Sequence, residues 1–131
     1  MPYRNDPRPL FDARMAIHVA LTAILAWLGF IIGLPGDTFA TTPAWRFFAT
    51  VGTEGQWAGL FFLAAMIGGA GIDTTRRWLK VSSILVLATA HGSLALLFLR
   101  GNPYGGASGT FGIVALLGYY LAWRQAYGYR G

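Results

Sequence analysis

The chain has no cysteine and very little charge. Only 11% of its 131 residues are charged, against about a quarter in ordinary soluble domains. The absence of cysteine excludes a disulfide framework, a thiolate metal site and a cysteine nucleophile. A soluble domain of this size would have too few charges to cover its surface. With 55% hydrophobic residues, the composition predicts a chain whose main solvent is not water.

Four long runs contain no Lys, Arg, Asp or Glu. They cover residues 15–34, 56–72, 81–99 and 107–123. At about 1.5 Å per helical residue, the first run reaches about 30 Å, the thickness of a bilayer core. The runs show neither the polar stripe of a soluble helix nor the alternation of a barrel strand. We therefore predict one all-α membrane domain, residues 1–131, built as a bundle of four transmembrane helices.

The first run could also be read as a cleaved signal peptide. Arg4, Arg8 and Arg14 precede it and resemble the basic start of such a segment. The apolar run is too long for a signal peptide, however, and the best cleavage site, at residues 38–40, is a weak one. We interpret this run as a retained span.

Basic residues are distributed unequally between the two sides of this predicted bundle. Eight of the ten fall on one side: Arg4, Arg8, Arg14, Arg76, Arg77, Lys80, Arg124 and Arg130. Only Arg46 and Arg100 fall on the other. The positive-inside rule then puts both termini and the short loop between the second and third runs in the cytoplasm. Because the charge lies at helix ends, anionic headgroups explain it better than nucleic acid does.

The long loop on the outer side, residues 35–55, has local helix signals. Thr42 followed by Pro43 predicts the start of a short helix over residues 43–50. We expect this helix to lie flat, with its aromatic side chains in the membrane interface.

A second signal in this loop marks the start of the next span. Thr53 and Gln56 match a capping box, with Glu54 in the first helical turn. Arg46 is expected to reach headgroups or an acid such as Asp37 or Glu54.

Two histidines lie within the spans, His91 near the middle of the bilayer and His18 close to the cytoplasmic side. An intramembrane ionisable group is a candidate proton relay, pore-lining residue or haem ligand. The alternative is a neutral histidine that hydrogen-bonds to a neighbouring helix. Two histidines that ligate one haem iron must lie at the same depth, and these differ by about 10 Å. Neither has a partner at metal-ligand spacing, so we predict no cofactor and no metal.

Small residues recur four apart in the second and fourth runs. The positions are Ala64, Ala65, Gly68, Gly69, Gly105, Ser108, Gly109 and Gly112. Such pairs let helix backbones approach closely. They predict helix contacts, either between copies of the chain or within one copy.

Several short stretches resemble small multi-pass membrane proteins encoded by tailed bacteriophages. These stretches are residues 34–39, residues 42–44, Glu54 with residues 57–60, and residues 118–124. The resemblance implies insertion into the membrane during infection and no catalytic role. It marks an outer-face cluster of Asp37, Thr38, Arg46, Glu54 and Trp57.

The sequence contains no nucleophile triad, paired carboxylates or phosphate-binding loop, so a non-enzymatic protein is expected. Two function classes remain. One is a phage-type membrane effector, holin-like or related to superinfection, that acts as an oligomer. The other is a small channel, transporter or accessory subunit of a larger membrane complex, with His91 facing a path or a partner. A haem-binding subunit is a third, less favoured class.

Overall fold

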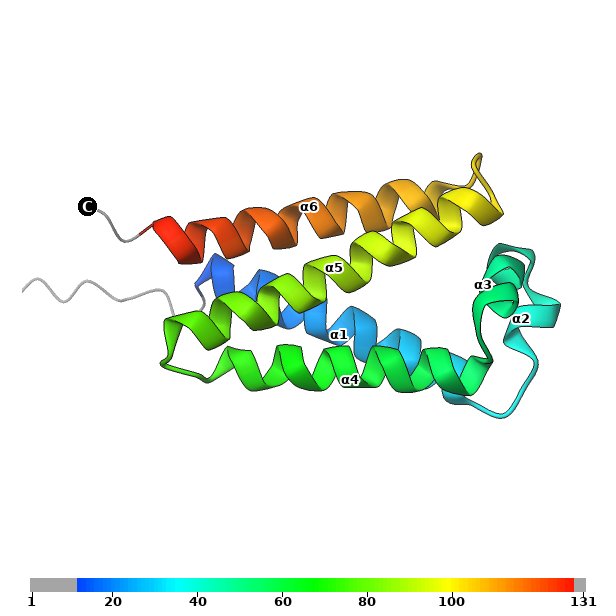
Figure 1. The fold of residues 1–131 in the computed structure, drawn as a ribbon, viewed down its shortest axis with the longest axis horizontal. Helices are drawn as coiled ribbons and strands as arrows, with labels where there is room; N and C mark the ends of the chain where they lie inside the picture. The colour runs from blue at the N-terminus through cyan, green and yellow to red at the C-terminus, as the bar shows by residue number, and fades with distance from the viewer. Residues whose placement is uncertain (1–11, 129–131) are drawn as a thin grey trace, which may run out of the picture.

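The computed structural model describes residues 12–128 as a bundle of four long helices (Figure 1). These are α1 (Ala13–Gly33), α4 (Glu54–Ile72), α5 (Arg77–Gly101) and α6 (Gly106–Tyr127). Three short elements join α1 to α4: α2 (Thr38–Thr41), η1 (Pro43–Trp45) and α3 (Arg46–Val51). The described residues contain no strand, which confirms the predicted all-α fold. Arg4, Arg8 and Arg130, which entered the prediction of orientation, lie outside them.

The long helices extend beyond the apolar runs that predicted them. Helix α5 begins at Arg77, four residues before the predicted start at residue 81, and α6 continues to Tyr127, four residues past 123. A helix needs only its backbone hydrogen bonds to continue, and these do not depend on side-chain polarity. Hydropathy therefore marks the part of each helix that is suited to lipid. The helix itself can continue into the polar residues beside that part.

Local capping signals explain where two of the helices begin. The Asp12 carboxylate accepts a hydrogen bond from the Arg14 backbone N–H at 3.1 Å, at the start of α1. The predicted capping box at Thr53 and Gln56 is confirmed, with both reciprocal hydrogen bonds present. Pro43 opens η1 as predicted, but the Thr42 side chain makes no capping hydrogen bond.

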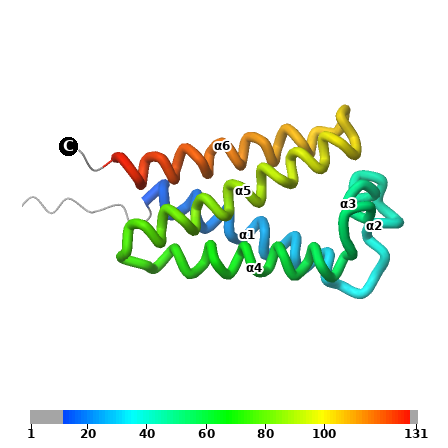
Figure 2. Tube along the Cα trace, in the orientation of Figure 1, coloured from blue at the N-terminus to red at the C-terminus, as the bar shows by residue number. Residues whose placement is uncertain are grey.

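The bundle consists of two antiparallel helix pairs. Helix α1 packs mainly on α4, and α5 packs mainly on α6, while the pairs meet chiefly through α4 and α5. Figure 2 shows that three parts of the chain lie together at one end of the molecule: the start of α1, the connection between α4 and α5, and the end of α6. We call this the basic end (residues 12–18, 72–80 and 124–128) and the opposite one the loop end. The long loop between α1 and α4 lies at the loop end.

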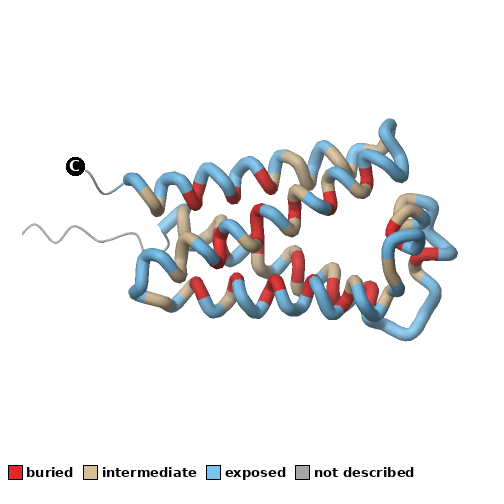
Figure 3. Tube along the Cα trace, viewed as in Figure 1, coloured by how far each residue is buried: buried red, intermediate tan, exposed pale blue. Residues whose placement is uncertain are grey.

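The interior and the outside of the bundle are both apolar. Buried positions line the facing sides of the helices (Figure 3), with Leu25 and Leu87 fully enclosed. Outward-facing side chains are also large and hydrophobic: Met66 is 65% exposed and Leu116 is 69% exposed. All four long helices are long and apolar enough to cross a membrane. The fold is compatible with an integral, multi-pass membrane protein, since lipid is the solvent that such an exterior requires.

The long loop folds differently from the predicted interfacial helix. It contains η1 and α3 across the predicted range 43–50, and an additional short helix, α2, before them. Phe48 is fully buried. The expectation that the aromatic side chains of residues 43–50 enter the membrane interface is therefore wrong for Phe48. Phe39, which precedes that range, is also buried, at 4% exposed.

The loop's aromatic rings pack inward because they fill the space between the two helix pairs at the loop end. We call this group the aromatic cluster: Phe39, Trp45, Phe48, Trp57, Phe98 and Phe111. Phe48 lies at its centre, with its ring centroid 5.0 Å from Phe98 on α5 and 5.1 Å from Trp57 on α4. The cluster thus joins the loop to both pairs.

Candidate functional site

His91 lies near the middle of α5 and is fully buried in the bundle. Its Nδ1 atom is 2.8 Å from the Leu87 carbonyl oxygen, one turn earlier in the same helix. A carbonyl oxygen only accepts hydrogen bonds, so Nδ1 is the nitrogen that carries the proton. The other nitrogen, Nε2, is buried and has no hydrogen-bond partner among residues 12–128. In this neutral tautomer, Nε2 presents an unsatisfied lone pair to the interior.

On the side of the loop end, His91 is adjacent to the aromatic cluster. The His91 and Phe111 ring centroids are 6.1 Å apart, and Phe111 stacks on Phe98 at 5.4 Å. These rings offer no strong hydrogen-bond acceptor or donor to Nε2. The interior beyond His91 is therefore closed by apolar rings.

His18 lies where α1, α4 and α5 meet near the basic end, and it is 3% exposed. Its Nε2 atom is 3.5 Å from the Ser83 hydroxyl oxygen. Ser83 donates its own proton to the Lys80 carbonyl at 2.8 Å, so its oxygen is free to accept from His18. Gly71 makes this junction possible, because a Cβ atom at that position would overlap the Ser83 side chain.

Polar groups continue from His18 toward His91. The Thr22 hydroxyl, one turn along α1, donates to the His18 carbonyl at 3.0 Å. A Cβ atom built on Gly68 would lie 2.8 Å from the Thr22 hydroxyl and 2.6 Å from a Leu87 methyl group, so these side chains flank the same point of α4. We call His18, Ser83, Thr22 and His91 the polar row. These residues lie at successive levels between the basic end and the centre of the bundle, and no hydrogen bond among the described residues joins His91 to the other three.

The two histidines occupy different levels of the bundle. His18 reaches the level of Ser83, and His91 lies eight residues further along α5, a rise of about 12 Å. This geometry does not place two imidazoles around one haem iron. No group of three or more His, Cys, Asp or Glu side chains able to hold a metal ion occurs in the described part of the chain.

A small hollow leads from the basic end to His18. Its volume is about 70 Å³, and it is lined by Asp12, Arg14, Met15, His18, Ile72, Lys80 and Gln125. Charged and amide side chains share its lining with the imidazole. His18 is therefore reachable from the basic end.

Three of the five residues of the predicted outer-face cluster support the long loop through hydrogen bonds to its backbone. The Glu54 carboxylate accepts a hydrogen bond from the Phe39 backbone N–H, and the Trp57 indole N–H donates to the Phe48 carbonyl at 3.1 Å. Asp37 caps α2 through the Ala40 N–H at 3.3 Å. Thr38 begins α2, and Arg46 is exposed.

Most of the predicted small-residue contacts lie within the chain. Ala64, Ala65 and Gly68 are buried between α4 and its neighbours, and Gly69 is half-buried. On α6 and its N-terminal boundary, Gly105, Ser108 and Gly112 are half-buried. Gly109 differs, because it is exposed and a Cβ atom there would meet nothing within 4 Å.

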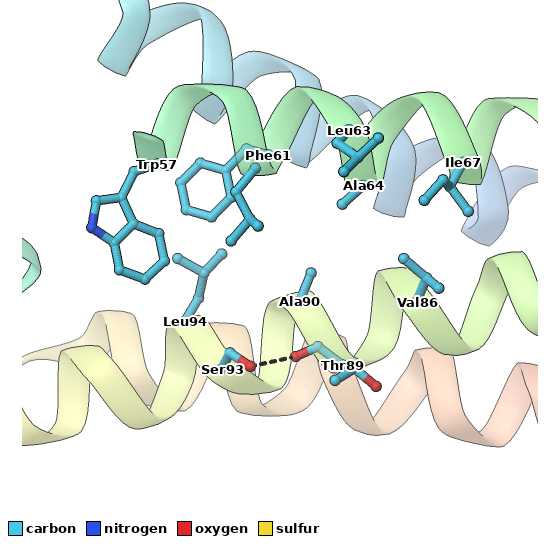
Figure 4. Close-up of a pocket in the computed structure, with 11 residues that line it drawn as sticks. Trp57, Phe61, Leu63, Ala64, Ile67, Val86, Thr89, Ala90, Ser93 and Leu94 are labelled. Carbon is cyan, nitrogen blue, oxygen red and sulfur yellow. Dashed lines mark hydrogen bonds between the residues drawn. The ribbon is translucent and has the colours of Figure 1, made fainter. Parts of the chain in front are cut away.

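A lateral groove between α4 and α5 was not predicted from the sequence. Its volume is about 220 Å³, and its walls are mostly apolar, with Trp57, Phe61 and Leu94 among them (Figure 4). Its two hydroxyl groups already have partners: Ser93 donates to the Thr89 carbonyl at 2.9 Å, and the Thr89 hydroxyl lies 3.1 Å from that of Tyr119. The groove arises where the two helix pairs diverge, which no periodicity in the sequence encodes.

Comparisons with protein-family models, curated proteins and solved structures found no match to this chain.

Proposed function

We propose that the chain is a non-enzymatic membrane protein of the channel or transporter class that moves protons, with His91 as the central group of its path. The observation that carries this proposal is the buried, unpartnered Nε2 atom of His91. It presents a proton acceptor at the centre of the bundle.

A leucine at the position of His91 would avoid an energetic cost that the buried histidine has. A buried polar atom without a partner costs about 1–3 kcal/mol, whereas an apolar side chain of similar volume has no such cost. Histidine also changes charge between about pH 5 and 8. A histidine at this depth lowers stability if it serves only for packing, whereas its ability to take up and release a proton is useful in a proton carrier.

The polar row and its hollow support access from the basic end. His18 borders the hollow, Ser83 and Thr22 lie beside His18, and His91 lies eight residues further along α5 than Ser83. The aromatic cluster lies beyond His91. Transfer across the whole bundle therefore requires the helix pairs to separate at the loop end.

Proton flux into liposomes tests this proposal. Purified protein is reconstituted with a pH-sensitive dye in the lumen, and a potassium diffusion potential drives protons inward. We expect wild-type protein to acidify the lumen several-fold faster than protein-free liposomes, and His91→Leu to match the protein-free rate. Ser93→Ala is the matched control, since it removes an exposed hydroxyl two residues away. Flux in His91→Leu equal to wild type would refute the proposal.

We further propose that the basic end faces the cytoplasm of a bacterial cell. Arg14, Arg76, Arg77, Lys80 and Arg124 lie at this end of the described bundle, with Arg46 and Arg100 at the other. This distribution is the one that the positive-inside rule associates with cytoplasmic loops.

A phage-type membrane effector that acts as an oligomer is a second candidate, and Gly109 is the observation that favours it. The open space at this glycine would let another helix approach α6 closely. Controlled expression with a membrane-potential dye tests this class. Depolarisation by wild type that is lost in Gly109→Leu would support it, and no depolarisation would exclude it. Gly68→Leu is unsuitable for this purpose, because Gly68 packs inside the bundle.

A further inference from the structure

A pocket at the basic end combines cationic and apolar walls. Its volume is about 590 Å³, and it lies between the start of α1, the α4–α5 connection and the end of α6. Met15 and Ile72 supply apolar wall, while Lys80, Thr74 and Gln125 supply polar groups. We call it the basic-end pocket. No residue of the polar row lines it, although it adjoins the hollow beside His18 and shares Met15, Ile72, Lys80 and Gln125 with that hollow.

Two cations of α5 line this pocket, and the structure holds one of them in place. The Arg77 guanidinium donates through Nε to the Gln125 carbonyl at 2.8 Å and through Nη2 to the Ala126 carbonyl. These two bonds fix the Arg77 side chain at the last turn of α6. The other N–H groups of the guanidinium can donate to a ligand. Lys80, one turn further along α5, is half-buried and contributes a second positive charge.

Other groups at the pocket also favour an anion. Helix α5 begins at Arg77 without a side-chain cap, so its first N–H groups and its positive dipole end lie at the pocket. The Thr74 hydroxyl oxygen accepts from the Arg76 N–H at 3.3 Å, which leaves its proton available to a ligand. Asp73 is the one acid among the lining residues. With Arg77 and Lys80 opposite it, the lining keeps a net positive charge.

We propose that the basic-end pocket binds the phosphate group of an anionic phospholipid. Basic pockets between transmembrane helices are suited to such headgroups. The apolar walls favour a lipid over a soluble phosphate, because Met15 and Ile72 would contact the glycerol and the first methylene groups. Arg77 also borders a second, outward hollow of about 440 Å³, lined with Trp78, Val81, Ser82 and Ala126. An acyl chain can follow this hollow down the outside of α5.

Lipid-dependent thermal unfolding of the full-length protein in detergent tests this proposal. Dioleoyl phosphatidylglycerol is titrated against wild type, with dioleoyl phosphatidylcholine, inorganic phosphate and glycerol 3-phosphate as separate arms. We expect phosphatidylglycerol alone to raise the unfolding temperature. In Lys80→Gln the half-saturating lipid concentration should rise about fivefold, which is the effect of about 1 kcal/mol per cation near a membrane surface. Lys80→Arg should restore the wild-type value.

Arg124→Gln is the matched control, because Arg124 is an exposed cation at the same end that does not line the pocket. It should keep wild-type affinity for phosphatidylglycerol. Equal losses in Lys80→Gln and Arg124→Gln would overturn the proposal, since they would indicate unspecific attraction between charges. A Lys80-dependent shift with inorganic phosphate as large as that with lipid would assign the pocket to a soluble anion and overturn the lipid assignment. His91 takes no part in this assay, so its outcome is independent of proton flux.

Discussion

At the scale of single residues, two histidines in one bundle have different surroundings. His18 lies beside the Ser83 hydroxyl group in the interior and borders a hollow with polar walls. His91 bonds only to the carbonyl of its own helix and presents Nε2 to apolar neighbours. The difference comes from the partner helices and from the level of each residue, because both face inward but His18 lies near the start of α1 and His91 near the middle of α5.

Replacement of His91 by leucine should stabilise the protein. The variant removes a buried atom without a partner, so we expect the free energy of unfolding to rise by about 1–2 kcal/mol. Far-UV circular dichroism during heating in detergent measures this as a higher unfolding temperature. His18→Leu is the comparison and should lower the temperature, since it removes the partner of Ser83. A lower unfolding temperature in His91→Leu would show that Nε2 has a partner.

The histidines also show the limit of prediction from sequence at this scale. The positions of the apolar runs predicted that both histidines would lie in long apolar helices and at different levels, and the structure agrees on each point. The missing partner of Nε2 could not be predicted, because it depends on which side chains of α6 and the long loop face α5. An apolar run assigns a residue to a helix suited to a membrane without identifying its neighbours.

At the scale of elements, α4 shows how small residues determine helix contacts. Gly68 and Gly71 face Thr22, Leu87 and Ser83, so α1 and α5 approach the α4 backbone closely at these positions. The spacing of small residues predicted such a contact at Gly68 but did not include Gly71. It could not say that the partners are helices of the same chain, because that requires the angle and rotation of each helix.

Substitution of Gly71 should separate α4 from α5. A methyl group there overlaps the Ser83 side chain, and overpacking of this kind costs about 1–3 kcal/mol. Gly71→Ala is therefore expected to lower the unfolding temperature in detergent. Gly109→Ala is the matched control: it should leave the temperature unchanged or raise it, because alanine has the higher helix propensity and its methyl group meets open space. Equal effects of the two variants would contradict the described packing of α4.

The long loop is a second element whose structure depends on distant partners. Phe48 is expected to be its main anchor, and truncation of a buried phenylalanine costs about 3–5 kcal/mol. Phe48→Ala should therefore expose residues 34–53 to limited proteolysis in detergent while α1 and α4 stay protected. Phe30→Ala, at a position 49% exposed on α1, should leave the cleavage pattern unchanged. Wild-type protection in Phe48→Ala would mean that the aromatic cluster does not hold the loop.

At the scale of the whole molecule, the two ends of the bundle have different chemistry. The basic end carries cations and polar hollows, and the loop end carries the aromatic cluster. The charge distribution along the sequence predicted which end carries most of the cations, and the apolar runs predicted the number of long helices. Neither predicted the two-pair arrangement, since hydropathy contains no information on which spans pack most closely.

The absence of cysteine allows a direct test of orientation. Thr75→Cys puts a single thiol at the basic end, and Tyr104→Cys puts one at the loop end, where residue 104 is 99% exposed. With a membrane-impermeant maleimide, we expect Tyr104→Cys to react in spheroplasts and Thr75→Cys to react only after permeabilisation. The reverse pattern would invert the proposed orientation, and labelling of both from one side would refute four crossings.

The two-pair arrangement has a consequence for synthesis of the protein. Helices α1 and α4 form a hairpin that is translated before α5 and α6, and they carry the long loop between them. Phe48 and Trp45, however, pack against Phe98 of α5, which is translated later. The loop therefore completes its packing only after most of α5 has been made, so a segment of the first hairpin is finished by a residue of the second.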